Sequence, residues 1–144
     1  MENSDDTFVG DVVALPFYMT TSSTESARTL YAHALSIFEG DPDDEDTAPI
    51  TMLKQAIILD PTLEDAYEAL GVILHRHHKV EEAIRYMKML AKLSPQCVMA
   101  HTNLSVFYMT KGMIEEAEEE KAIAGQLEMT QSLDARKAKQ QAVE

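Results

Sequence analysis

Several residue types are scarce in this sequence, and each scarcity excludes a class of protein. The chain has one cysteine in 144 residues, which excludes an internal disulfide framework and is typical of a reducing compartment. Lys and Arg total 12 against 25 Asp and Glu, so the formal net charge is -13. Such a chain repels phosphate backbones and anionic membranes, and we therefore expect no nucleic acid and no membrane among its partners.

Long apolar runs and targeting signals are also lacking. The longest apolar run near the start, Val12–Met19, is too short to span a bilayer and contains Pro16. Asp5 and Asp6 precede the first basic residue, Arg28, whereas a secretory signal begins with basic residues. We therefore expect a cytoplasmic protein. A composition that is 45% hydrophobic, with only five Gly and five Pro, favours one helical domain.

The chain contains an internal repeat with a period of 34 residues. Asp60-Pro61 recurs at this offset as Ser94-Pro95, and a further step back from Ala66 and Tyr67 reaches Ala32 and His33. The same offset aligns Leu59 with Leu93, Ala66 with Ala100, Leu70 with Leu104, Val72 with Val106, and Glu81-Glu82-Ala83 with Glu115-Glu116-Ala117. So many matches predict three units, over about residues 30–63, 64–97 and 98–131.

The period and the residues at fixed positions resemble the tetratricopeptide repeat, a helix–turn–helix unit. The middle unit matches that family at Tyr67, Leu70-Gly71, Ala83, Met87, Leu90 and Pro95. The third unit matches it at His101, Leu104-Ser105, Tyr108, Gly112, Ala117 and Ala124. The resemblance covers about residues 30–125. It implies an all-α fold, a right-handed α-solenoid of stacked hairpins with a C-terminal capping helix.

Apolar spacing and the proline positions indicate where the helices should lie. We expect helices at about 23–38, 48–59, 63–76, 80–93, 97–110 and 114–128, with more helix to about 140. We divide the chain into a mostly irregular segment 1–21, a tetratricopeptide domain 22–128, and a capping or extension helix 129–144.

The first unit departs from the repeat at its second helix. Pro49 stands where the later units have Ala83 and Ala117, and proline fits only the first turn of a helix. This helix should therefore begin late, near Ala48. The acidic connection before it, residues 39–46, is longer than usual.

Two departures concern the later units. His78 replaces the residue that is Gly112 in the third unit, which predicts a strained or altered turn. Met129 replaces the expected closing proline, so the last helix should continue into the tail. We interpret the charge run at 115–122 as the solvated face of this helix.

The acidic run 39–46 also raises calcium binding as a hypothesis. Its alternating acids match the spacing of a calcium loop at Asp41, Asp43 and Glu45. However, Asp46 stands where that loop needs glycine, and Met52 stands where it needs a bidentate Glu. We therefore interpret the run as a solvated acidic turn, or as a patch for a basic partner.

A metal-dependent or thiol enzyme is the hypothesis from a different class. His75 and His78, with His77 between them, could share a helix face and hold a metal, but the run ends a helix, where cations offset the dipole. Cys97 and His101 are four residues apart, although His101 occupies an aromatic packing position of the family. No phosphate loop, GxSxG, HExxH or CxxC motif is present. We expect no catalytic residues, no metal and no cofactor.

The resemblance implies that the first helices of the units line a concave groove that binds peptides or helices. Its groove positions fall on Tyr31, Ala34, Phe38, Asp65, Glu68, Val72, His75, Met99, Thr102, Val106 and Met109. This lining is largely apolar, which suits an apolar peptide or an amphipathic helix of another protein. Clamping of a C-terminal carboxylate is not expected, because Asp65 and Glu68 would repel it and Asn103 alone matches that subclass.

Several readings of the function remain open. The primary hypothesis is an adaptor or scaffold, and the alternative is a small acidic chaperone for secreted proteins, which the chain resembles in outline. The apolar segment Phe8–Met19 would either cap the stack or occupy the groove until a partner displaces it. Three repeats are close to the minimum for stability, so self-association through the stack ends is a further possibility.

Overall fold

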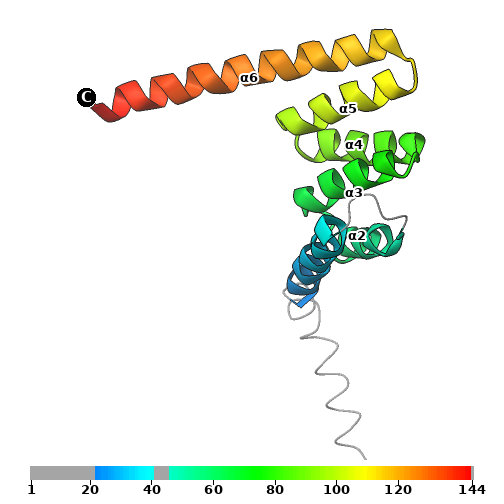
Figure 1. Ribbon diagram of the computed structural model, residues 1–144. Helices are drawn as coiled ribbons and strands as arrows, with labels where there is room; N and C mark the ends of the chain where they lie inside the picture. The colour runs from blue at the N-terminus through cyan, green and yellow to red at the C-terminus, as the bar shows by residue number, and fades with distance from the viewer. Residues whose placement is uncertain (1–21, 41–45, 144) are drawn as a thin grey trace, which may run out of the picture.

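The computed structural model describes residues 22–40 and 46–143, which form helices joined by short connections (Figure 1). A first helix covers residues 22–40. It is followed by α2 (Ala48–Leu59), α3 (Glu64–Arg76), α4 (Val80–Leu93), α5 (Val98–Thr110) and α6 (Ile114–Val143). These two ranges contain no strand, and the predicted all-α fold is confirmed. No helix in them is both long enough and apolar enough to cross a membrane.

The helices stack in chain order into an elongated array (Figure 1). Each of α2 to α5 contacts the next helix, and α3 also contacts α5 directly. The first helices of consecutive hairpins therefore adjoin along one side of the array. This arrangement is the α-solenoid that the repeat predicted.

The aligned small and leucine positions form the interior of the stack. Leu70 and Leu104 are at most 1% exposed, and Ala83 and Ala117 are equally buried. Burying one leucine side chain stabilises the fold by roughly 1.5–3 kcal/mol. Because the same positions are buried in consecutive units, the core is continuous from one hairpin to the next.

Close approach of α3 and α4 depends on Gly71. A Cβ atom added there would collide with Met87 Cε and lie 3.3 Å from Met87 Cγ. Met87 itself is fully buried between the two helices. The absence of a side chain at Gly71 therefore leaves room for Met87 of the neighbouring helix.

The α3–α4 and α5–α6 turns share one backbone pattern. The Lys79 N–H donates to the Leu74 carbonyl, and the Met113 N–H donates to the Tyr108 carbonyl, each at 2.9 Å. Each of these bonds joins the N–H of one residue to the carbonyl five residues earlier, which is the capping bond of a helix C-terminus. The residue just before the N–H donor takes the left-handed conformation. That residue is Gly112 (φ 78°) in one turn and His78 (φ 62°) in the other, so the strain predicted at His78 is confirmed.

The first hairpin differs from the others in register. Helix α2 begins at Ala48 with Pro49 in its first turn, as predicted. In the preceding helix, however, Ala32 and His33 are exposed while Ala34 is fully buried. The pairing of Ala32 and His33 with Ala66 and Tyr67 is therefore wrong.

A longer connection explains this shift. An offset of 36 residues aligns Tyr31 with Tyr67 and Ala34 with Leu70, two more than the repeat period. The connection between the first helix and α2 is longer than the three-residue turn before α4. Most of it, residues 41–45, lies outside the described residues, as does the segment 1–21. The interpretation of residues 39–46 as a solvated acidic turn rather than a calcium loop, and the role of Phe8–Met19, stay predictions.

Helix α6 continues through the position of the missing proline. It runs unbroken from Ile114 to Val143, as predicted from Met129. Its first half packs on α5 through Ala117 and Ala124 and closes this end of the stack. Residues 128–143 are all exposed, so the second half projects beyond α5 (Figure 1).

Replacing His78 with glycine should stabilise the protein. Glycine adopts the left-handed conformation without the steric strain of a side chain, and His78 is exposed, so few contacts are lost. We expect the free energy of unfolding, measured by urea denaturation, to rise by about 0.5–1 kcal/mol. The reciprocal variant Gly112→His should lower it by about 1–2 kcal/mol. A loss of stability in His78→Gly would contradict this account of the turn.

Candidate functional site

Helix α5 carries an exposed apolar strip on the predicted groove face. Met99, Val106 and Met109 are 46%, 48% and 52% exposed, and their spacing places them on one face of the helix. We call these three residues the α5 strip. Thr102 lies within it, with its hydroxyl donating to the Val98 carbonyl at 3.0 Å. All four predicted α5 positions therefore share one exposed face.

A cavity of about 230 Å³ lies between the first helix and α3. It is lined by Tyr31, Leu35, Phe38, Asp65, Glu68, Ala69, Val72 and Ile73. Five of these are predicted groove residues, and we call the cavity the acidic–aromatic pocket. Ala34 is fully buried and does not line a groove, because the register of the first helix is shifted. Leu35, Ala69 and Ile73 were not predicted as groove residues.

Burial and like charges give this pocket its electrostatic character. Burial raises the pKa of the Glu68 carboxyl, and the neighbouring Asp65 raises it further. Burial likewise raises the pKa of the Tyr31 hydroxyl, with Asp65, Glu68 and Glu39 adding to the effect. Asp65 and Glu68 therefore form an acidic side of the pocket beside Tyr31, which favours a cation carried on an apolar stem, while the Arg76 guanidinium lies 5.6 Å from the centroid of the Phe38 ring.

His75 connects the pocket side of α3 with α5. Its ring stacks on Phe107, with centroids 4.6 Å apart, and its Nε2 lies 2.8 Å from Thr110 Oγ1. The Thr110 hydroxyl donates to the Val106 carbonyl, so Nε2–H is the donor to Thr110. Burial lowers the pKa of His75, and His78 and Arg76 add to the effect, which favours the neutral ring.

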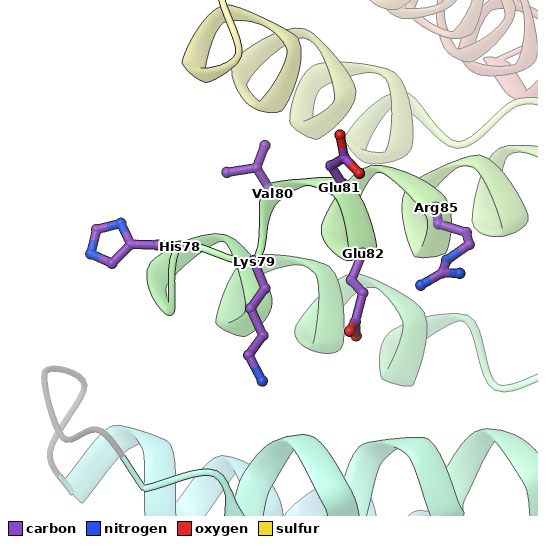
Figure 2. A pocket seen from close by; sticks show the side chains of 6 residues that line it. All are labelled: His78, Lys79, Val80, Glu81, Glu82 and Arg85. Carbon is purple, nitrogen blue, oxygen red and sulfur yellow. The ribbon is translucent and has the colours of Figure 1, made fainter.

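A second hollow, of about 500 Å³, lies at the α3–α4 turn (Figure 2). The two acidic residues of this hollow form ion pairs with neighbouring helices of the stack and do not point toward one common site. Glu82 pairs with Lys54 of α2 at 3.1 Å, and Glu81 pairs with Lys111 after α5 at 2.7 Å. Figure 2 shows His78 pointing away from both acids. We interpret this hollow as structural.

The candidate metal and thiol residues are dispersed. The His75 ring packs on α5, whereas His78 lies in the turn and points outward. His101 Nδ1 lies 2.6 Å from Glu120 Oε2, and both side chains are largely buried, which fixes α6 on α5. Cys97 is half-buried at the start of α5. Among the residues that the structure describes, no three His, Cys, Asp or Glu side chains gather as a metal site would need.

Comparison with known proteins identifies the architecture. No protein-family model matches the chain, and no curated protein sequence matches it significantly. A crystal structure of MamA matches with a TM-score of 0.70 and 25% identity, over 76% of this chain and 62% of that chain. The chain therefore spans only part of the length of MamA.

Two further solved structures match over more of their own length. The second TPR of Spaghetti (RPAP3), bound to an HSP90 peptide, gives a TM-score of 0.68 at 14% identity and covers 75% of this chain and 96% of that chain. The Yersinia enterocolitica type III secretion translocator chaperone SycD gives 0.66 at 16% identity, over 78% and 86%.

Fold and comparisons together define an α-solenoid of helical hairpins. The stacked hairpins, the buried repeat positions and these structural matches show that the chain has the tetratricopeptide-repeat fold, as its residues predicted. The groove assignment of individual side chains remains a proposal.

Asp65→Asn should lower the pKa of Glu68 and of Tyr31, because it removes a like charge beside both groups. Side-chain NMR titration of the Glu68 carboxyl measures the effect. Glu64→Gln removes the same charge one residue earlier and should leave both values nearly unchanged. Equal shifts in the two variants would contradict a specific role of Asp65.

Proposed function

We propose that the chain is a protein–protein interaction module, an adaptor or scaffold, that binds an apolar peptide or amphipathic helix of another protein. The observation that carries this proposal is the α5 strip, three large apolar side chains that are each about half exposed on one helix face. Exposed apolar side chains gathered on one surface commonly mark an interaction site. Methionine adapts to varied apolar partners because its side chain is flexible and polarizable.

The acidic–aromatic pocket adds a charge preference. A Lys or Arg of the ligand would pack its aliphatic stem on Tyr31 and bring its cation toward Asp65 and Glu68, because Arg76 of this chain already lies over the Phe38 ring, 5.6 Å from its centroid. The ligand would therefore combine apolar residues for the α5 strip with at least one basic residue for the pocket. The net charge of -13 favours the same partner at long range.

Two observations on related folds support a peptide ligand. Both TPR domains of Spaghetti (RPAP3) were solved with the HSP90 peptide SRMEEVD. That ligand is acidic, whereas the pocket here is lined by acids. We therefore propose a peptide ligand here as well, lying along the first helices of the hairpins, with the opposite charge preference.

A panel of synthetic amphipathic peptides tests the proposal. The peptides share one apolar face and carry Lys, Glu or Gln at the flanking positions, and fluorescence anisotropy measures their affinity. We expect the Lys peptide to bind most tightly, and Val106→Glu to weaken it at least tenfold, about 1.4 kcal/mol. Glu68→Gln should reduce the preference for Lys over Glu.

Met89→Glu is the matched control for Val106→Glu. Met89 is 43% exposed on α4, away from the proposed groove, so its variant adds the same charge elsewhere. It should leave peptide affinity unchanged. If both variants weaken binding equally, or neither does, the groove is not the binding surface.

The alternative function is a chaperone for secreted proteins. The acidic surface and the likeness of the fold to SycD favour it. This alternative predicts a partner that stays soluble only when co-expressed with this chain, and whose solubility is lost with Val106→Glu. The ratio of soluble to total partner, measured with each variant, separates it from an adaptor, whose partner would be soluble alone.

A further inference from the structure

Helix α6 carries a second periodic surface on the side away from α5. Exposed residues recur alternately four and three residues apart, at Glu115, Glu119, Ala122, Gln126, Met129, Leu133, Arg136, Gln140 and Val143. We call this row the α6 seam. Its spacing is the heptad spacing of helices that pair. The face that packs on α5 carries Ala117 and Ala124 and lies on the opposite side of the helix.

Within the described residues, the projecting half of α6 is tied to the stack near its start, where the Gln131 side-chain amide donates to the Gln96 carbonyl at 2.8 Å, and its seam side is uncovered. Of α2 to α5, only α5 contacts α6, and residues 128–143 are all exposed. These residues extend about 24 Å as a helix. Met129 and Leu133 in the seam are 66% and 49% exposed. A helical segment of this length is marginal in water unless its apolar face is covered.

Charge is distributed unevenly along the helix. The acidic end has Glu115, Glu116, Glu118 and Glu119, all exposed, whereas the far end has Arg136, Lys137 and Lys139. Apolar and neutral seam residues lie between the two ends. An antiparallel partner helix of the same sequence would therefore present bases to acids at both ends and apolar side chains at the centre.

We propose that two copies of this chain pair through the α6 seam as an antiparallel, two-fold symmetric dimer. With the axis midway between Gln126 and Met129, Ala122 of each copy faces Leu133 of the other. In the same register Glu119 faces Arg136, and on the two flanks of the seam Glu118 pairs with Lys139 and Glu116 pairs with Lys137. Symmetry produces each contact twice. A parallel pairing would instead bring acids against acids.

The pairing leaves the proposed groove free. The seam shares no residue with the α5 strip or with the acidic–aromatic pocket, and it lies across α6 from α5. A dimer would therefore present two grooves, and a ligand with two binding segments would gain avidity. The dimer does not depend on the proposed peptide-binding function.

Charge reversal tests the register directly. One variant carries Arg136→Glu and Lys139→Glu, and the other carries Glu118→Lys and Glu119→Lys. Sedimentation velocity over a micromolar concentration series measures the mass of each. We expect the unaltered chain to be a dimer that weakens with added salt, and each variant alone to be a monomer. An equimolar mixture of the two variants should restore the dimer, because acids again face bases at both ends.

The mixing experiment separates lost pairing from lost folding. A variant that had merely unfolded could not regain a dimer on mixing, and circular dichroism checks its helix content. The control Lys79→Glu with Lys92→Glu makes the same charge change on exposed residues outside α6 and should remain dimeric. A monomeric unaltered chain, or a dimer that both reversed variants retain, would overturn the proposal.

Discussion

The stack depends on one constraint: no single hairpin can bury its own apolar face. Leu70 and Met87 are fully buried only because α3 and α4 approach closely at Gly71 and are covered in turn by the next hairpin. The consequence is a core that is continuous along the array and is closed at the C-terminal end by the first half of α6. Each hairpin is covered by the next one, and the proposed groove and the long last helix are the surfaces that this stacking leaves exposed.

Much of this fold could be predicted from the sequence because the repeat preserves both ends of each helix. Pro61 and Pro95 mark where one hairpin follows another, and a residue with positive φ ends α3 and α5 alike. The first helix was placed in the wrong register because its position depends on the length of an irregular connection. A period of 34 carries no information about that length, so Ala34 was assigned to the groove although it is buried.

The candidate site was predictable in position but not in chemistry. The family resemblance placed Asp65, Glu68 and Val72 on one helix, and these residues line a cavity together with Tyr31 and Phe38. What the sequence could not provide was the relation between helices. The stacking of His75 on Phe107 joins residues 32 positions apart, and the His101–Glu120 pair joins two helices across a turn. Such contacts depend on crossing angles, which local patterns do not specify.

The last helix illustrates how a repeat array ends. A fourth unit would need apolar side chains where the third has Ala100, Leu104 and Phe107, but the same offset reaches Asp134, Ala138 and Gln141. Such a helix could not fold back and bury a core, and without a proline at Met129 nothing interrupts α6. The chain therefore continues straight, and its outward face acquires a heptad spacing that the repeat itself does not have. The residues that lose the spacing of a further hairpin are therefore the same residues that gain the heptad spacing, because α6 closes the stack with its first half and leaves its second half free to pair.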